Sequence, residues 1–197
     1  MTPKEKMDHQ DEYHGNLITM LELIWGEGYM APGGPGNVAK MFEGIEATGK
    51  RILDIGCGIG GPVFEMANRF SAEVVGIDLE APLIERATET ATKKGLQGKC
   101  TFRTVETGPL DFPDQSFDIV TTSGAMTQIS DKAGILGECF RVLKPGGSLT
   151  CYDWTKSAAP YSEDMLYWFK MEGLTYALET LEEYEIHLKN SGYVDVS

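Results

Sequence analysis

The sequence predicts a doubly wound α/β fold, in which a mostly parallel sheet carries helices on both faces. Short apolar runs of strand length alternate with amphipathic runs of about 10–14 residues, which is the pattern of strand–helix–strand units. A glycine-rich turn follows the first strand of that series, where glycine lets the backbone turn tightly before the next helix. The chain has 197 residues, of which 42% are hydrophobic, so it can bury one such core with a modest appendage.

The segment before the series is expected to contain two helices and a long loop. Residues 11–25 place apolar side chains at three- and four-residue spacing, which predicts an amphipathic helix. Five glycines and two prolines lie within residues 26–36, so this stretch is a loop, and it is longer than a simple connection requires. A helical pattern resumes over residues 37–45.

The alternating series follows in chain order. Its members are strand 51–55, helix 61–69, strand 73–77, helix 81–94, strand 100–104, a turn at 113–114, strand 117–121, helix 132–142, a turn at 144–147 and strand 148–152. After residue 153 the pattern changes to a polar loop, an aromatic-rich helix at 162–173, a helix at 180–190 and a final strand at 193–196. Because helices separate most of the strands, the strands are expected to run parallel.

The charge balance limits the partners that the protein can bind. Asp and Glu number 30 against 17 Lys and Arg, which gives a net charge of -13, and the basic residues form no cluster. A surface with this charge repels phosphate backbones, and we therefore expect no nucleic-acid partner. A ligand is expected to be cationic or neutral. No apolar run approaches the ~18 residues of a membrane helix, and the charged start lacks the apolar stretch of a signal peptide. We therefore expect no membrane association.

The cysteines and histidines indicate neither disulfides nor a metal site. Cys57, Cys100, Cys139 and Cys151 show no C-x-x-C spacing and lie within apolar patterns, and the three histidines are scattered. This usage predicts free thiols in a reducing compartment and hence a cytoplasmic location.

The glycine turn carries a carboxylate that helps to identify its ligand. The segment 51–61 reads RILDIGCGIGG, and Gly56, Gly58 and Gly61 satisfy G-x-G-x-x-G, a pattern that also fits a dinucleotide site. Asp54 precedes the first glycine by two positions, where a carboxylate would repel a pyrophosphate and attract a cationic group. The methionine part of S-adenosylmethionine carries two positive charges and no phosphate, so the turn favours that cofactor.

Two further carboxylates follow the next strands. Asp78 ends the second strand 20 residues after Gly58, where an acidic side chain can accept both ribose hydroxyls of a nucleoside. Glu106 follows the third strand, where its carboxylate could accept a hydrogen bond from the amino group of adenine. Neither position separates S-adenosylmethionine from a dinucleotide.

Four motifs together resemble the class I S-adenosylmethionine-dependent methyltransferases, whose fold is Rossmann-like. They read LDIGCGIG at 53–60, GID at 76–78, FPDQSFD at 112–118 and RVLKPGG at 141–147, so the resemblance covers about residues 40–155. It implies that a bound S-adenosylmethionine contacts Asp54, Gly56, Cys57, Gly58, Gly60, Asp78, Leu79, Glu106, Thr107 and Ser123. The family commonly has Asp where Glu106 stands, so the longer side chain is expected to shift the adenine slightly.

The methyl acceptor is expected at the carboxyl ends of the strands. The loop at 26–34 is similar to one in small-molecule methyltransferases that act on phosphoethanolamine, on sarcosine and dimethylglycine, and on sterols. The resemblance implies that this loop closes over the cofactor and that Tyr29 reaches the site of methyl transfer. The phosphoethanolamine enzymes have His and Asp where this chain has Gln128 and Gly124, which places phosphobase specificity in doubt.

The candidate residues on the acceptor side follow from these positions. We predict Tyr29, Gln128 and Asp153 as catalytic residues, and Tyr29, Gln128 and Trp154 as contacts of the acceptor. The glutamine can orient an acceptor but cannot be a general base. The acidic and aromatic composition of residues 157–197 favours a cationic acceptor, and therefore an amine nitrogen.

The chain is thus divided into an N-terminal part with the lid loop (1–47), a cofactor-binding core (48–155) and substrate-side helices with a final strand (156–197). Two other classes remain open, a nicotinamide-dependent oxidoreductase and a non-catalytic cofactor-binding module. Because the family's sheet normally finishes with a further antiparallel strand, we expect either a longer natural chain or a homodimer that covers the exposed strand edges.

Overall fold

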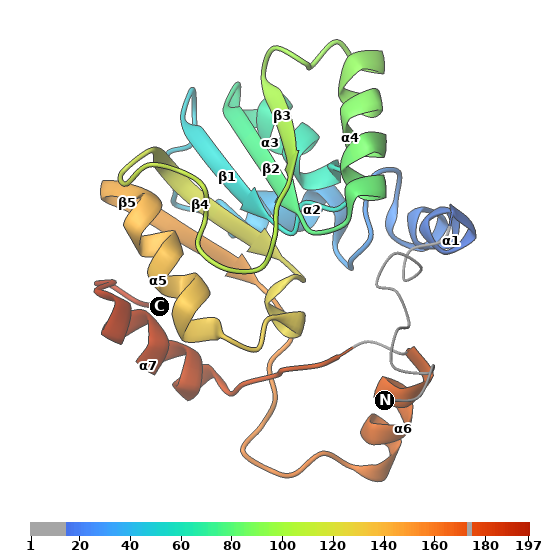
Figure 1. The fold of residues 1–197 in the computed structure, drawn as a ribbon, viewed down its shortest axis with the longest axis vertical. Helices are drawn as coiled ribbons and strands as arrows, with labels where there is room; N and C mark the ends of the chain where they lie inside the picture. The colour runs from blue at the N-terminus through green and yellow to red at the C-terminus, as the bar shows by residue number, and fades with distance from the viewer. Residues whose placement is uncertain (1–14, 173–174) are drawn as a thin grey trace.

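The computed structural model describes residues 15–172 and 175–197, and it contains the predicted sheet (Figure 1). Its strands are β1 (Arg51–Ile55), β2 (Glu73–Asp78), β3 (Cys100–Thr104), β4 (Phe117–Ser123) and β5 (Leu143–Tyr152). They lie in the order β3-β2-β1-β4-β5, and every neighbouring pair is parallel. The direction of chain progression reverses between β1 and β4, the position at which ligands bind to such sheets. The expected doubly wound fold is confirmed.

Helices cover both faces of the sheet. One face carries α2 (Gly34–Met41), α3 (Gly61–Phe70) and α4 (Ala81–Lys93), and the other carries α5 (Lys132–Val142) and α7 (Leu181–Ser191). Figure 1 shows α1 (Gly15–Trp25) at one side of the molecule, and α6 (Glu163–Glu172) away from the sheet at the end of a long loop. None of the helices in the described parts of the chain is long and apolar enough to span a membrane.

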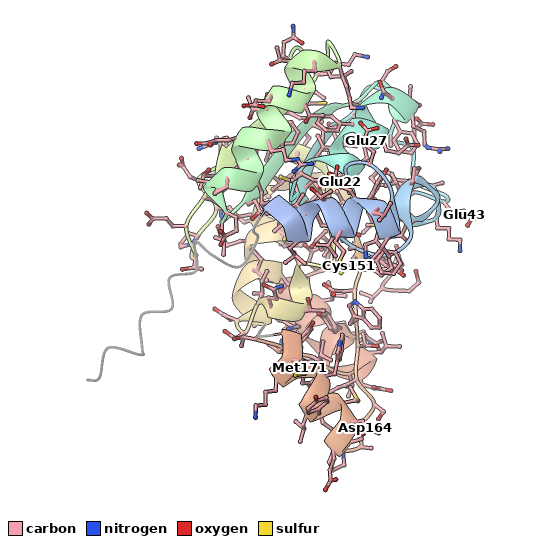
Figure 2. The ribbon with its side chains drawn as sticks, turned by 90° about the vertical axis from the view of Figure 1, so that its right-hand side faces the viewer. Glu22, Glu27, Glu43, Cys151, Asp164 and Met171 are labelled. Carbon is pink, nitrogen blue, oxygen red and sulfur yellow. The ribbon has the colours of Figure 1, made fainter. Side chains whose placement is uncertain are left out.

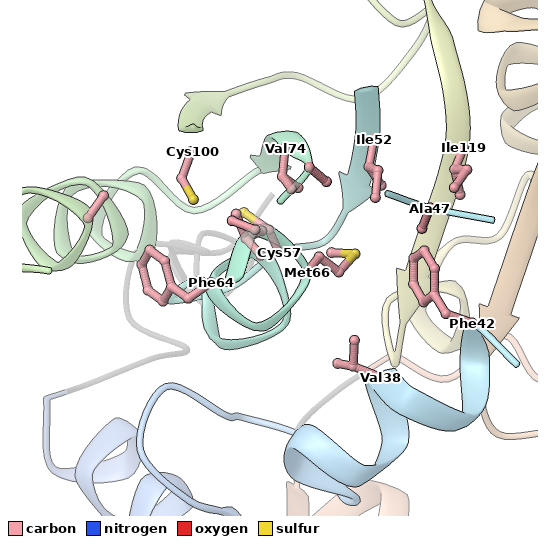
Figure 3. Packing of buried hydrophobic residues seen from close by; sticks show 14 of the residues in the cluster. Val38, Phe42, Ala47, Ile52, Cys57, Phe64, Met66, Val74, Cys100 and Ile119 are labelled. Carbon is pink, nitrogen blue, oxygen red and sulfur yellow. The ribbon is translucent and has the colours of Figure 1, made fainter. Parts of the chain in front are cut away.

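Two apolar clusters sandwich the sheet, and Figure 3 shows the one beneath α2 and α3. Successive side chains of a strand point to opposite faces, so adjacent residues enter different clusters. The cluster of Figure 3 contains Ile52, Val74 and Ile119. The next residue of each strand lies in the other cluster, and these residues are Leu53, Val75 and Val120. This burial on both faces explains why the strands read as continuous apolar runs.

The expected turn at 144–147 is an irregularity within β5. Phe117 pairs with Leu143 and Ile119 pairs with Ser148, so four residues of β5 lie opposite Asp118 alone. Gly146 has a φ of 77° there, and a Cβ on Gly147 would approach the carbonyl oxygen of Asp118 to 2.8 Å. The strand therefore bulges at its glycines and regains register for the segment that reaches the site.

The expected final strand at 193–196 is wrong. The Tyr193 N–H donates to the Leu188 carbonyl at 3.1 Å, which completes the C-terminal cap of α7. The Tyr193 ring packs on Phe140 of α5 with centroids 5.1 Å apart, and its hydroxyl donates to the Leu136 carbonyl. Val194 and Asp195 are both exposed, and Asp195 has a φ of 53°, so this segment has neither the alternating burial nor the extended backbone of a strand. Packing against α5 replaces the strand, and β5 is an outer strand of the sheet.

Candidate functional site

Two other segments of the chain pack closely against the glycine turn between β1 and α3. Gly56 and Gly58 have φ values of 71° and 52°, which favour glycine. A Cβ on Gly56 would lie 2.2 Å from the Cβ of Ala125, which follows β4. A Cβ on Gly58 would lie 3.1 Å from the Sδ of Met30 in the loop before α2. The turn can therefore approach a ligand with bare backbone, as its sequence predicts.

Gly60 and Cys57 serve packing at this turn. A Cβ on Gly60 would meet the rings of Phe102 and Phe64 at 2.9–3.0 Å. The Cys57 side chain is buried in the apolar cluster of Figure 3, its N–H donates to the Ile77 carbonyl, and its carbonyl accepts from Gly60. The Cys57 thiol is thus committed to packing.

Asp54 is a buried carboxylate beside the turn. It lies in β1, is 2% exposed, and its Oδ2 has no hydrogen-bond partner among the described residues. Burial raises the pKa of Asp54 to about 8, and the nearby Asp78 carboxylate adds to the rise. A buried carboxylate without a partner is destabilising unless a cation or a donor joins it. The geometry therefore provides an acceptor for a cationic group at the carboxyl end of β1.

Asp78 holds the turn from the neighbouring strand. Its Oδ2 accepts from the Gly58 N–H at 2.9 Å, and its Oδ1 accepts from the Glu80 N–H at 3.0 Å. Burial raises the pKa of Asp78, while these backbone bonds oppose the rise. Each carboxylate oxygen has a second lone pair, so Asp78 can still accept hydroxyl donors from a ligand.

The remaining predicted cofactor contacts border these carboxylates. Leu79 follows Asp78 and is exposed, and Ser123 ends β4 beside the turn. Glu106 and Thr107 are exposed in the loop after β3, and the Val105 N–H donates to the Asp78 carbonyl at 2.9 Å. The structure therefore brings the loop after β3 to the same edge of the sheet as Asp78.

The loop at 26–33 lies across the glycine turn. The Gly28 carbonyl accepts from the Gly61 N–H at 2.9 Å, and a Cβ on Gly61 would approach that carbonyl oxygen to 2.3 Å. A cavity of about 50 Å³ separates the loop from the turn, and Met30, Gly58 and Ser123 are among its lining residues. The loop thus packs on the glycine turn itself.

Acidic side chains fasten this loop to α4. The Oε1 of Glu22 in α1 accepts from the Gly28 N–H at 2.8 Å, and its Oε2 pairs with Arg86 of α4. Glu27 in the loop pairs with Lys94 at 3.0 Å. Figure 2 shows Glu22 and Glu27 on the side of α1 that faces α4. These contacts join α1, the loop and α4 across the chain.

Tyr29, which is expected to reach the site of methyl transfer, is buried. It is 8% exposed, and it belongs to the apolar cluster that includes Val38 and Phe42. Burial raises the pKa of Tyr29 to about 12, and the Glu65 carboxylate adds to the rise. Its hydroxyl has no hydrogen-bond partner in the described parts of the chain. Tyr29 therefore stays protonated near neutral pH and can donate a hydrogen bond but cannot act as a base.

The predicted acceptor side comprises the residues that follow β5 and the 3₁₀ turn η2 (Met126–Gln128). The Asp153 Oδ2 accepts from the Thr127 N–H at 3.1 Å, and its Oδ1 accepts from the Trp154 N–H at 2.7 Å. Burial raises the pKa of Asp153 to about 6, although these bonds and Lys132 oppose the rise. Gln128 is exposed on η2, and Trp154 is 53% exposed. The structure thus places Asp153, Gln128 and Trp154 close together in the chain's fold.

Sequence reasoning missed two residues at this site. Met30 covers Gly58, but an apolar side chain in a loop gives no signal of such a role. Lys132 is 1% exposed beneath η2, whereas the sequence shows only a lysine at the start of a helix. The described residues contain no group of His, Cys, Asp and Glu side chains that could hold a metal ion.

Comparisons with known proteins agree with this geometry. The profile of a family described as "Methyltransferase domain" matches residues 46–187. The chain is 33% identical over 186 residues to phosphoethanolamine N-methyltransferase 1 of Arabidopsis thaliana, covering 94% of this chain and 37% of that protein. It is 36% identical over 172 residues to sterol 24-C-methyltransferase ERG6A of Gibberella zeae, covering 78% of this chain and 45% of that protein.

A solved structure has a similar fold. Phosphoethanolamine N-methyltransferase 2 of Haemonchus contortus, in complex with phosphomonomethylethanolamine and S-adenosylhomocysteine, superposes with a TM-score of 0.88 at 28% identity. The match covers 95% of this chain and 44% of that one. The same enzyme is also known in complex with S-adenosyl-L-methionine. The chain therefore spans less than half the length of these relatives.

Proposed function

The chain belongs to the methyltransferase domain family, and from that premise we propose that it transfers a methyl group from S-adenosylmethionine to a small-molecule acceptor, preferably an amine nitrogen. Similarity to enzymes that methylate phosphoethanolamine and sterols supports transfer to a small molecule. The acidic net charge of -13 supports an acceptor that is cationic or neutral.

The observation that carries the proposal is the unpartnered, buried Oδ2 of Asp54 beside the glycine turn. The α-amino group of S-adenosylmethionine is a cationic donor that would satisfy this oxygen. A pyrophosphate would instead place negative charge near Asp54 and Asp78, where burial and the Asp78 carboxylate already raise the pKa of Asp54. The site therefore suits S-adenosylmethionine better than a nicotinamide dinucleotide.

We assign several residues to the binding of this cofactor. Asp54 would accept from the amino group, and Asp78 would accept from the ribose hydroxyls with the lone pairs that Gly58 and Glu80 leave free. The exposed Glu106 and Thr107 would border the adenine. When bound, S-adenosylmethionine supplies an electrophilic methyl group on its sulfonium sulfur.

The residues of the acceptor side would orient the amine and take its proton. An amine that arrives protonated must lose that proton before its lone pair can react. The pKa of Asp153 is about 6, so this carboxylate is mostly ionised near neutral pH and can accept a proton. Gln128 can orient the acceptor through its amide, and the exposed Trp154 ring can contact a cationic group. Much of the rate would come from in-line positioning and the exclusion of water.

The acceptor of this chain need not be the acceptor of its relatives. Gln128 and Gly124 stand where the resemblance expects His and Asp, so an acid–base pair at those two positions is absent from the sequence. We therefore favour an amine without a phosphate group. We also propose a cytoplasmic location, because the cysteines are free thiols, and a dimer through the outer edge of β5.

Titration calorimetry with S-adenosylmethionine, S-adenosylhomocysteine and NADH tests the cofactor. A methyl-transfer assay with labelled S-adenosylmethionine then compares ethanolamine, phosphoethanolamine, sarcosine and dimethylglycine. We expect binding of both adenosyl compounds, none of NADH, and labelled product with an unphosphorylated amine. Binding of NADH alone would refute the proposal, and adenosyl binding without transfer to any acceptor would indicate a non-catalytic module.

A further inference from the structure

Lys132 is a buried cation without a role in the reaction proposed above. It begins α5 and is 1% exposed, although lysines are almost never fully buried unless they are paired. Its Nζ donates to the Ile129 carbonyl at 2.8 Å and to the Ala177 carbonyl, and lies 5.7 Å from the centroid of the Tyr184 ring. Burial lowers the pKa of Lys132, while the carboxylates of Glu179 and Asp153 oppose that effect.

The two carbonyls belong to segments far apart in the chain. Ile129 follows η2, and Ala177 lies between α6 and α7. The Ala177 N–H also donates to the Thr127 carbonyl at 2.7 Å, so both backbone polar groups of Ala177 are committed to this region. The Thr127 N–H donates to Asp153 at the end of β5. The turn η2 is therefore held from the sheet, from α5 and from the segment before α7.

This turn is part of the predicted acceptor side and adjoins the glycine turn. Ala125, immediately before η2, would touch a Cβ on Gly56, and Gln128 is exposed at the other end of η2. The Thr127 hydroxyl donates to the Gly124 carbonyl at 2.8 Å, which stiffens the turn. A displacement of η2 would consequently move Gln128 relative to Asp54 and the glycine turn.

We propose that Lys132 is a positioning residue that locks η2 to the segment at 175–180, and thereby sets the place of the acceptor relative to the cofactor. A buried apolar side chain could fill the same volume, but it would leave two carbonyls without their lysine donor. The effect on turnover rests on the proposed function, whereas the effect on the order of η2 does not.

The test compares Lys132→Met with the parent chain and with Lys189→Met, which removes an exposed lysine of α7 that pairs with Glu185. Amide hydrogen exchange is followed in segments 124–132 and 175–180 and in the strands of the sheet. Calorimetry with S-adenosylhomocysteine measures the Kd of the cofactor site. Steady-state kinetics with the acceptor amine identified in the methyl-transfer assay gives KM and kcat.

For Lys132→Met we expect exchange at least tenfold faster in the two segments, unchanged exchange in β1 and β4, and a cofactor Kd within twofold of the parent. The KM of the acceptor should rise at least fivefold, and Lys189→Met should match the parent throughout. If Lys132→Met fails to fold, Ala177→Pro removes the amide that donates to Thr127 and should give the same local pattern more weakly.

Two results would overturn the inference. One is exchange that stays protected in both segments, and the other is exchange that accelerates equally in the strands, because general destabilisation would then explain the variant. If the chain transfers no methyl group to any acceptor, the proposed function fails, but the exchange pattern still tests the clamp.

Discussion

Replacing Asp54 with Asn should stabilise the folded protein while it weakens cofactor binding. Asp54 ionises near pH 4 in an unfolded chain but has a pKa of about 8 in the fold, because burial and Asp78 disfavour its charge. Between these values the folded state binds the proton more tightly than the unfolded state. The contribution of this carboxyl to stability is therefore greatest below about pH 4, and it is lost as the pH rises toward about 8.

The magnitude follows from the same pKa. Each tenfold difference in proton affinity is worth about 1.36 kcal/mol. Raising the pH from about 4 to 7 ionises Asp54 in the unfolded chain but leaves it mostly protonated in the fold, which lowers the stability of the fold by at most about 4 kcal/mol. Burying an amide that lacks a partner costs about 1–3 kcal/mol, which reduces the gain. We expect Asp54→Asn to add about 1–3 kcal/mol at pH 7, or roughly 2–12 °C in Tm, and to lower the stability by about 1–3 kcal/mol at pH 4, where the cost of the amide is not offset.

Two assays separate the stability effect from the binding effect. Thermal unfolding from pH 4 to pH 8 should show that the Tm of the variant, measured relative to the parent, increases with pH. Calorimetry should show that S-adenosylmethionine binds the parent more tightly as the pH rises toward about 8, because the cationic amino group needs an ionised Asp54. The variant should have lost most of this affinity. A Tm difference that is independent of pH would refute the assigned titration, and unchanged affinity would refute the placement of the amino group.

Three further outcomes are expected. Asp78→Ala should weaken S-adenosylhomocysteine binding by ~1.5–3 kcal/mol, as for hydrogen bonds to a charged group, and should also lower the Tm because Asp78 accepts from Gly58 and Glu80; full affinity in calorimetry would exclude the ribose contact. Tyr29→Phe should lower turnover more than cofactor affinity and leave the Tm nearly unchanged, because the hydroxyl has no partner among the described residues; a fully active variant would assign Tyr29 to packing alone. Turnover should rise with pH through about 6 as Asp153 loses its proton, and a rate that is flat from pH 5 to pH 7 in the parent would exclude Asp153 as the base.

Local patterns were enough to predict the sheet and the glycine turn. The strands at 51–55 and 100–104 have the predicted bounds, because apolar runs bounded by turn residues are legible in the sequence itself. The same is true of Asp54, whose distance from Gly56 along the chain places it in the turn region. Its missing partner and its raised pKa could not be predicted, because they depend on burial and on Asp78 across the sheet.

Long-range contacts decided the features that sequence reasoning missed. The alternation of residues 193–196 is typical of a strand, yet the contact of Tyr193 with Phe140 placed this segment against α5. The burial of Lys132 depends on carbonyls at positions 129 and 177, and the sequence does not reveal that these meet. The packing of Tyr29 among Val38 and Phe42 likewise follows from the closure of the loop and not from its composition.

Because ion pairs of Glu22 and Glu27 hold the loop to α4, access to the glycine turn should depend on the ionic strength. Partly exposed ion pairs contribute only about 0–1 kcal/mol each, and salt at 1 M reduces the reach of their attraction to about 3 Å. Loosening the loop therefore requires the loss of two such pairs and a few backbone hydrogen bonds, and the withdrawal of Tyr29 from the edge of its apolar cluster, while the strands of the sheet stay paired. Dissociation of a ligand held beneath the loop should accordingly speed up with added salt, at a rate that the stability of the sheet does not control.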